Sequence, residues 1–430
     1  MAAGSLQHPR IAHARRFLIV VLFWSVLGTC GALPLLLAEE PNMPVADAIF
    51  EAISGLTTTG STVLVGLDDL PLSIRYYRQQ LQWLGGMGII VLAVAILPML
   101  GVGGMQLYRA EMPGPIKDTK LTPRIAETAK ALWYIYLTLT IACAVAYWLA
   151  GMTPFDAITH SFSTVATGGF STYDASMGHF DSHLINMICV VFMLISAVNF
   201  ALHFYAWRRR TVDAYSTDAE FRFYGGVLLV AFILVTGTLL ITGYYAGLDD
   251  TLSHAVFQIV SFSTTAGFAT ADVSAWPTFL PVLLIFLSFL GGMASSTSGG
   301  IKVIRFLLLF KQGQREIIRL IHPQAQVLVK VGDKAVNERV MDSIWGFFAT
   351  YMAVYAILLL TLMAMGLDQV TAFSAVAATL NNLGPGLGEV AANFGSLSAS
   401  AKLLLSVAMI MGRLEIFTLL VLLTPAFWRR

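Results

Sequence analysis

Four similar stretches recur along this 430-residue chain, each an amphipathic segment that runs into a turn rich in glycine, serine and threonine. The stretches are 44–63, 153–173, 249–270 and 368–388. Aligned on Gly60, Gly169, Gly267 and Gly386, they follow one another at intervals of 98 to 119 residues. Self-similarity at a nearly constant period indicates one structural unit used repeatedly. The chain is therefore expected to fold as four related units.

The segments between these stretches are long and apolar. The chain is 57% hydrophobic and 12% charged, with a mean hydropathy of +0.74, which is typical of membrane proteins and excludes an ordinary globular domain. Two apolar segments flank each stretch, and they approach or exceed the roughly 20 residues that cross a bilayer as a helix. They are 17–38, 79–100, 129–150, 184–206, 223–243, 279–310, 343–365 and 403–427.

The units are repeats 1–110, 111–210, 211–325 and 326–430, each with two spans and one loop. The fold class that follows is an all-α polytopic membrane protein of four helix–pore loop–helix repeats around a central ion pathway. Segment 17–38 is too long for the apolar core of a signal peptide, and we expect it to remain as a helix. Segment 326–336 alternates around Gly332-Asp333, which predicts a β-hairpin.

Charges are distributed unevenly between the two sides of the predicted membrane. Of the 26 Lys and Arg residues, 22 lie in the N-terminal tail, in 101–130, 208–222 and 302–339, and at the C-terminus. The positive-inside rule makes that side cytoplasmic, so both termini are inside and the loops enter from outside. Only Arg75, Arg78 and Lys402 are assigned to the outer side, against fourteen carboxylates. Such a rim attracts cations, although Asp47, Asp156 and Asp368 also stand where short helices should begin.

Loop backbone at membrane depth is tolerated only where it is buried in protein or lines an aqueous path. Four such loops in one chain imply a shared path, and glycine lets their carbonyl groups adopt conformations that a Cβ forbids. Rings of carbonyl oxygens are the chemistry that replaces the water around an alkali cation. The pattern therefore predicts a filter for a dehydrated monovalent cation.

The sixth span is interrupted by ten small residues between two apolar runs. Such a segment cannot form a stable lipid-facing helix, so we expect it to break and fold beneath the filter, where it obstructs the path. The predicted gate residues are Gly291, Gly292, Ser295, Ser296, Thr297, Ser298, Gly299, Gly300 and Lys302. Arg413 lies within the eighth span, where a charge is costly. We expect it to pair with the carbonyl groups of 294–300, with Glu415 as a weaker partner.

The four turns resemble the filter segments of the Trk/Ktr/HKT superfamily of potassium transporters, and nearly the whole chain resembles the membrane subunit of bacterial Trk systems. The matching segments are Thr58-Thr59-Gly60-Ser61-Thr62, Ala166-Thr167-Gly168-Gly169-Phe170, Thr264-Thr265-Ala266-Gly267-Phe268 and Asn381-Asn382-Leu383-Gly384-Pro385-Gly386-Leu387-Gly388. The resemblance implies a potassium site at Thr58, Thr59, Gly60, Thr167, Gly168, Gly169, Thr265, Ala266, Gly267, Asn382, Leu383, Gly384 and Gly386, with Gly386 rather than Gly384 as the fourth key glycine.

The same resemblance implies a homodimer in the bacterial cytoplasmic membrane. It also implies a cytoplasmic nucleotide-binding regulatory subunit, of the TrkA or KtrA kind, that works the gate formed by 291–300 and Arg413. Longer Trk subunits carry two additional N-terminal helices before the first repeat, whereas the first repeat helix of this sequence is expected to begin at about residue 17. Potassium is expected to be the transported ion. No covalently bound cofactor is expected. Segment 311–342 carries basic residues that suit anionic lipid or a protein partner.

Two other functions remain open from the sequence. A sodium- or proton-coupled secondary transporter would use the broken sixth span as its binding site. An integral-membrane enzyme would need clustered His, Asp or Glu within a span, and only His203 and Glu415 come near, so an enzyme is not expected. No nucleic-acid partner is indicated either.

Overall fold

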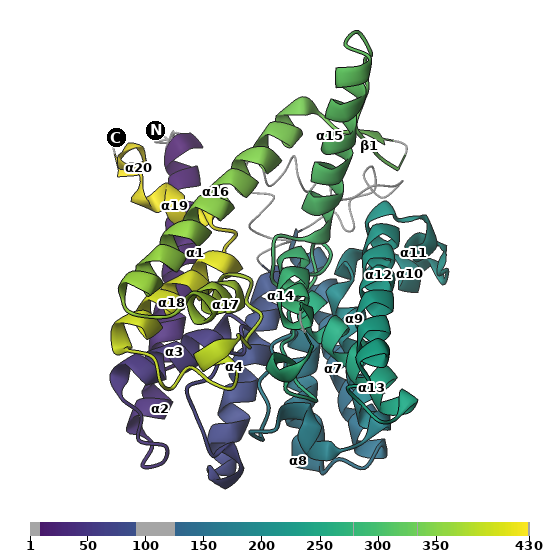
Figure 1. Ribbon diagram of the computed structural model, residues 1–430. Coiled ribbons are helices and arrows are strands. Elements are labelled where there is room, and N and C mark those ends of the chain that lie inside the picture. The colour runs from purple at the N-terminus through teal and green to yellow at the C-terminus, as the bar shows by residue number, and fades with distance from the viewer. Residues whose placement is uncertain (1–8, 92–124, 278, 333, 429–430) are drawn as a thin grey trace.

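Four short helices stand at the four repeated stretches in the computed structural model, which describes residues 9–91, 125–277, 279–332 and 334–428 (Figure 1). They are α3 (Val45–Leu56), α8 (Pro154–Ala166), α13 (Leu248–Ser263) and α17 (Gln369–Leu380). Local sequence sets their starts: the Thr153 side chain accepts a hydrogen bond from the Asp156 N–H, and Asp368 caps the N–H groups of Val370 and Thr371. Each short helix then ends in a turn that is almost wholly buried.

Further helices, most of them longer, flank each short one. They are α1 (Pro9–Cys30), α4 (Leu72–Val91), α7 (Ile125–Leu149), α9 (His183–Ala197), α12 (Ala219–Thr242), α14 (Leu280–Leu290), α15 (Val303–Ile321), α16 (Glu338–Ala364) and α18 (Ala399–Arg413). Connecting helices are α2 (Leu33–Leu37), α10 (Phe200–Arg209), α11 (Asp213–Thr217), α19 (Phe417–Leu423) and α20 (Pro425–Trp428), with 3-10 turns at Leu67–Asp69, Ser176–Phe180, Val273–Ala275 and Gly388–Val390. The helix–pore loop–helix architecture is thus present in the described residues, while the exact repeat boundaries stay a prediction.

The predicted spans differ from the observed helices in two places. Four described helical segments are long and apolar enough to cross a membrane, and two further pairs qualify if each is counted as one bent span. One pair, α9 and α10, bends by 93°, because Val198 is extended and Asn199 caps the next helix through the Ala201 N–H. The other pair, α18 and α19, bends by 115°, with Glu415 and Ile416 in the left-handed region. The fourth and eighth predicted spans are therefore also bent, where the sequence predicted continuous segments. The end of the second predicted span, 92–100, lies outside the described residues.

Helix α4 packs unusually close to two of the short helices. A Cβ on Gly85 would lie less than 3.0 Å from the carbonyl oxygen of Leu56 at the end of α3. A Cβ on Gly86 would lie 2.6 Å from the Tyr136 hydroxyl and 2.9 Å from the Ala166 side chain at the end of α8. The glycines of 85–88 therefore permit close helix packing, and α4 is held against the ends of α3 and α8.

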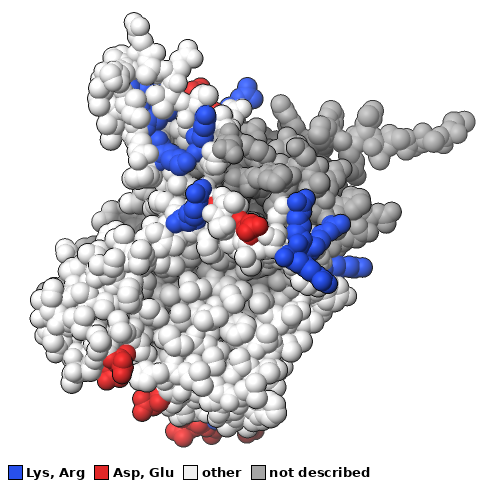
Figure 2. Space-filling model, turned by 90° about the vertical axis from the view of Figure 1, so that its right-hand side faces the viewer, with Lys and Arg blue, Asp and Glu red and all other residues white. Residues whose placement is uncertain are grey.

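The two ends of the molecule carry opposite charge. Figure 2 shows Lys and Arg side chains gathered on the upper part of one face with a few Asp and Glu among them, further Asp and Glu at the lower edge, and a wide uncharged surface between. Large apolar side chains on the outer sides of long helices remain exposed, such as Ile19, Ile233 and Leu360. The beginning of α1 and the final helix α20 lie at the same end as the projecting parts of α15 and α16 (Figure 1). An apolar belt between charged ends is what a bilayer requires.

The predicted hairpin is present as a two-stranded antiparallel sheet. Strand β1 (Lys330–Val331) pairs with β2 (Lys334–Ala335) in the register Lys330 to Ala335. Val331 is buried against the side chains of α15 and α16. The hairpin therefore closes the connection between these two helices at the basic end of the molecule.

Alanine substitutions at two helical glycines should distinguish the effect of close packing on stability from the effect of helix propensity. Gly85→Ala should lower the thermal unfolding temperature of the purified protein in detergent, because the added methyl group meets the Leu56 carbonyl oxygen. Gly226→Ala in α12 should keep or raise it, because nothing lies within 4 Å of the added carbon and alanine favours the helix. Equal melting temperatures for the two variants would contradict the close packing of α4.

Candidate ion-conducting site

The four turns after the short helices have the same backbone conformation. In each, a Thr or Asn with a left-handed backbone is followed two residues later by a left-handed glycine. The pairs are Thr58 and Gly60, Thr167 and Gly169, Thr265 and Gly267, and Asn382 and Gly384, with φ between 51° and 55° for the first member and between 77° and 104° for the second. The residue between them donates its N–H to a carbonyl group in the last turn of the short helix at 2.8–2.9 Å in all four loops. We call these turns filter loops 1 to 4.

This equivalence corrects the fourth key glycine. The resemblance pointed to Gly386, but Gly384 has the left-handed conformation shared by the other three glycines, and Gly386 does not. The N–H of Gly386 instead donates to the Val390 carbonyl group at 3.2 Å, and its Cα faces the Val390 side chain. The sequence signal that identifies Gly384 is the polar residue two positions before it, Asn382, which matches the threonines of the other loops.

The filter loops contact one another in a closed cycle. A Cβ on Gly60 would overlap the carbonyl oxygen of Gly168, and the same holds for Gly169 with Ala266, Gly267 with Leu383 and Gly384 with Thr59, all at less than 3.0 Å. Each loop thus contacts the next, and the fourth returns to the first. The ring brings together the predicted residues of all four turns, with Gly386 outside the contact cycle. Its glycines lack side chains because the neighbouring carbonyl groups occupy that space.

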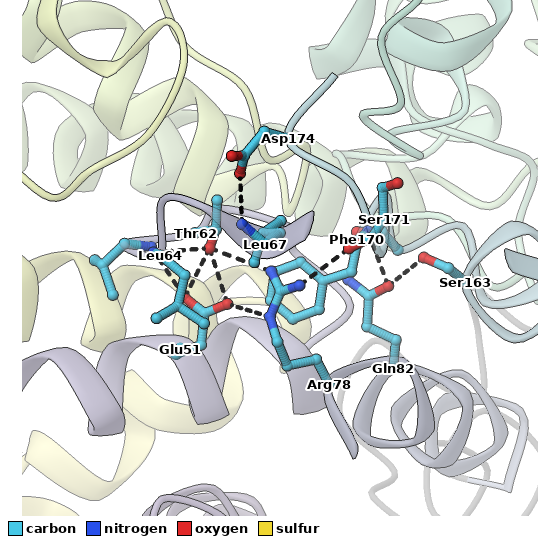
Figure 3. Close-up of polar contacts among 12 residues, drawn as sticks. Glu51, Thr62, Leu64, Leu67, Arg78, Gln82, Ser163, Phe170, Ser171 and Asp174 are labelled. Atoms are coloured by element: carbon cyan, nitrogen blue, oxygen red, sulfur yellow. Dashed lines mark hydrogen bonds and ion pairs between the residues drawn. The ribbon is translucent and has the colours of Figure 1, made fainter. Parts of the chain in front are cut away.

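Two polar side chains of α4 support loops 1 and 2 (Figure 3). Arg78 forms an ion pair with Glu51 of α3 at 2.8 Å and donates to the carbonyl group of Ser171 at 3.0 Å. Both charged side chains are at most 1% exposed. Arg78 and Glu51, which the charge distribution assigns to the outer side, are therefore buried in the protein and not exposed at its rim. Their partners lie in other elements or in another repeat.

Gln82 lies one helical turn after Arg78 and contacts loop 2 directly. Its side-chain nitrogen donates to the carbonyl oxygen of Gly168 at 2.6 Å. Its oxygen accepts hydrogen bonds from the Ser163 hydroxyl and from the Phe170 N–H. A Cβ on Gly168 would lie 2.5 Å from the Gln82 amide, and its three nearest heavy atoms all belong to Gln82. Sequence reasoning missed this residue, although Arg and Gln four apart within an apolar span are a detectable signal.

Carboxylates at the acidic end also have structural partners. Asp174 accepts hydrogen bonds from the N–H groups of Gly66 and Leu67, which joins loop 2 to the segment after loop 1 (Figure 3). Asp47 pairs with Lys402 at 2.8 Å. Hydrogen bonds from the Thr371 side chain and backbone lower the pKa of Asp368, which keeps this helix cap ionised. These three carboxylates at the acidic end therefore have structural roles: Asp368 caps a helix, and Asp174 and Asp47 join separate segments.

The predicted break in the sixth span is present between α14 and α15. Ser296, Thr297 and Ser298 are at most 1% exposed. The segment touches loop 3, where the Gly299 N–H donates to the Thr265 hydroxyl at 2.6 Å, and the residue before loop 4, where the Gly300 N–H donates to the Asn381 carbonyl group at 2.9 Å. We call residues 291–302 the gate segment. It lies directly against the filter loops.

The structure gives the gate segment several further anchors. Gly291 is left-handed and faces the Gly299 carbonyl group, and the Val303 N–H donates to the carbonyl group of Gly292. The Ser295 carbonyl group accepts from the Phe200 N–H at 3.2 Å, and the ammonium group of Lys302 donates to the carbonyl group of Ser298. The segment is therefore a folded loop with specific contacts to the bend between α9 and α10.

Arg413 at the end of α18 makes the contact expected from its position. Its Nη1 donates to the carbonyl oxygen of Thr297 at 3.0 Å, and the side chain is 3% exposed. Glu415, the weaker candidate partner, instead pairs with Arg305 of α15 at 2.7 Å. Within the described part of the chain, no cluster of three or more His, Cys, Asp or Glu residues could hold a metal ion.

Comparison with known proteins agrees with this geometry. A family model described as TrkH, cation transport protein, matches residues 3–430. The chain belongs to the TrkH family. The Trk system potassium uptake protein TrkH of Vibrio parahaemolyticus is 64% identical over 415 residues, which cover 96% of this chain and 86% of that protein. The TrkG protein of Escherichia coli K12 is 46% identical, over 96% of this chain and 85% of that protein.

The TrkH fold is also found among solved structures. The crystal structure of the potassium transporter TrkH from Vibrio parahaemolyticus matches with a TM-score of 0.90 and 58% identity, over 100% of this chain and 88% of that one. Membership of this family makes the protein a polytopic membrane protein of a transporter family. The roles of individual filter and gate residues are not part of that assignment.

The contact between Gly168 and Gln82 gives a test of how a TrkH-family filter loop is supported. Gly168→Ala should reduce ion uptake by about tenfold or more, because the methyl group displaces the Gln82 amide from loop 2. Gln82→Ala in the same chain should restore part of the lost expression and thermal stability by removing the clash. The equivalent residue in loop 3 is Ala266, so the backbone itself accepts alanine. A double variant no better than Gly168→Ala would contradict the contact.

Proposed function

We propose that this protein admits potassium into the bacterial cytoplasm through a selectivity filter formed by filter loops 1 to 4. The observation that carries the proposal is the closed cycle of contacts between each filter glycine and a carbonyl group of the next loop. Loops held in this way can present backbone carbonyl oxygens to one path from four sides, which suits a dehydrated alkali cation. The names of the similar proteins, which are potassium uptake proteins and a potassium transporter, support the choice of ion.

The gate segment is proposed to close the path beneath the filter. It is buried, and hydrogen bonds join it to Thr265, Asn381 and Arg413. Because the Arg413 side chain ends on a carbonyl group of the segment, its charge and length hold the loop in place. Movement of α15, which continues directly from the segment, would then open the path.

Orientation and partners follow from the charged ends. The basic end, where α1 begins and α20 ends, is proposed to be cytoplasmic, so that the filter opens to the outside. A cytoplasmic nucleotide-binding regulatory subunit is proposed to act on the projecting α15 and α16, and the membrane subunit is proposed to form a homodimer. The Trk system named for the similar proteins is consistent with further components.

Glycine substitutions in a host that lacks its own potassium uptake systems should test the filter. Gly60→Ser, Gly169→Ser, Gly267→Ser and Gly384→Ser should each reduce potassium preference over sodium about tenfold or more, because the side chain collides with the neighbouring carbonyl group. Potassium and sodium uptake are measured together in each strain, with and without a coexpressed Trk regulatory subunit.

Gly66→Ser is the matched control for the glycine series. It has a similarly left-handed backbone, with φ of 73°, but nothing lies within 4 Å of an added Cβ. It should therefore cost stability without changing ion preference. Full potassium preference in the four filter variants would refute the filter. Obligatory co-movement of sodium or protons with potassium would instead favour the coupled transporter.

Arg413→Ala should raise potassium flux in the absence of a regulatory signal, because the gate segment loses the hydrogen bond at Thr297. Efflux from proteoliposomes measures this basal flux directly. Lys402→Gln is the control, since it removes another buried cation of α18 whose partner, Asp47, lies away from the gate segment. A folded Arg413→Ala protein with no more leak than the parent would exclude the role of the arginine in closing the path.

A further inference from the structure

The filter glycines account for contact between the loops, but the structure also shows what sets the distance between loops 1 and 2. We propose that Arg78 and Gln82 of α4 are positioning residues that hold these two loops at the spacing required for preference of potassium over sodium. The inference rests on the proposed filter and concerns side chains outside it. Both lie on one face of α4, because residues four apart in a helix are neighbours.

Arg78 joins elements from both repeats. Its Nε pairs with Glu51 in α3, and its Nη2 donates to the Thr62 hydroxyl just after loop 1 at 3.2 Å. Its Nη1 donates to the Ser171 carbonyl group just after loop 2. The guanidinium also lies over the Phe170 ring, with its carbon 4.2 Å from the ring centroid. One planar group therefore fixes the exits of loops 1 and 2 relative to each other.

Glu51 completes this junction from the side of loop 1. Its carboxylate accepts hydrogen bonds from the Thr62 hydroxyl at 2.9 Å and from the Val63 N–H at 2.9 Å (Figure 3). The carboxylate and guanidinium, both at most 1% exposed, thus share Thr62 as a partner. Charge-assisted hydrogen bonds in such a buried network are stronger and more rigid than neutral ones at the surface.

Gln82 acts on the ring itself. The carbonyl oxygen that accepts its N–H belongs to Gly168, and the same oxygen is the one that faces Gly60 of loop 1. The Gln82 oxygen meanwhile holds the N–H of Phe170, two residues further along. The Gln82 amide therefore forms hydrogen bonds with the backbone on both sides of Gly169. A shift of this amide moves a carbonyl group that lies at the contact between loops 1 and 2.

Two of the other three junctions use different contacts. Loop 4 meets loop 1 through the Ser61 hydroxyl, which donates to the Gly384 carbonyl group at 2.8 Å, and through the Asn382 amide, which donates to the Thr59 hydroxyl at 2.9 Å. Loops 2 and 3 meet where the Gly178 N–H donates to the Ala269 carbonyl group. These hydrogen bonds join residues of the loop regions, and the Asn382 amide also donates to the Met409 carbonyl group of α18 at 3.0 Å. At the junction of loops 1 and 2, a transmembrane helix supplies the support, so that its position determines the spacing.

The chain offers a matched pair of glutamines for the test. Gln79 and Gln82 lie on the same helix and are both 0% exposed, but the Gln79 amide has no hydrogen-bond partner among the described residues. Gln82→Met should reduce the potassium-to-sodium uptake ratio by about fivefold or more, because methionine keeps the volume and loses the hydrogen bonds. Gln79→Met should leave the ratio within about twofold of the parent.

Arg78→Lys supplies a second, independent variant. Lysine keeps a positive charge for Glu51 but cannot make the forked contacts to Thr62 and Ser171 together. The ratio should again fall, while the amount of protein in the membrane and its thermal unfolding in detergent show that the chain still folds. A merely structural role would lower both ion fluxes in proportion and leave their ratio unchanged.

The outcomes separate this inference from the proposed function. A parent chain that prefers potassium, with Gln82→Met or Arg78→Lys losing that preference and Gln79→Met keeping it, supports the positioning role. An unchanged ratio in folded Gln82→Met and Arg78→Lys overturns it, as does an equal loss in Gln79→Met. Failure of the parent itself to take up potassium, with or without a regulatory subunit, overturns the filter and the positioning role together.

Discussion

The contact on which the rest of the structure depends is that between a glycine of one filter loop and a backbone carbonyl group of the next. It occurs four times in a closed cycle and leaves no room for a Cβ. Loops at such short separation need support from their surroundings, because the hydrogen bond shared by all four loops runs back to the loop's own short helix and not to the next loop. The buried short helices, the glycines of α4 and the network around Arg78 all supply that support.

The four loops have equivalent backbones but different surroundings. Position 168 shows the difference: the corresponding residues are Thr59, Ala266 and Leu383, whereas loop 2 has glycine because the Gln82 amide occupies the side-chain space. This departure from fourfold regularity therefore marks a neighbour, Gln82, that contacts one of the four loops. The repeat sets the backbone, and single helices such as α4 then make the four positions chemically distinct.

The four loops, three of the four key glycines and the break in the sixth span could be predicted, because local composition and period determine them. The fourth key glycine was assigned to Gly386 although Gly384 has the shared conformation, because the two glycines stand two residues apart and only backbone conformation separates them. The bends at Asn199 and Glu415 were missed, because neither a side-chain cap nor a left-handed residue lowers the average hydropathy of the segment from which a span is predicted. Arg78 was assigned to the surface, because its partners Glu51 and Ser171 are distant in sequence.

Loop 2 is the place where the gate segment and the support from α4 meet. The Thr167 hydroxyl lies 3.3 Å from the Thr297 hydroxyl of the gate segment, and Arg413 donates to the carbonyl group of the same Thr297. The next residue, Gly168, is held by Gln82. Removal of Thr297 from Thr167 would therefore leave the contacts between α4 and loop 2 in place. In the proposed mechanism, the filter keeps its selectivity while the gate segment moves, and the buried contacts of α4 would supply the second, independent support that this requires.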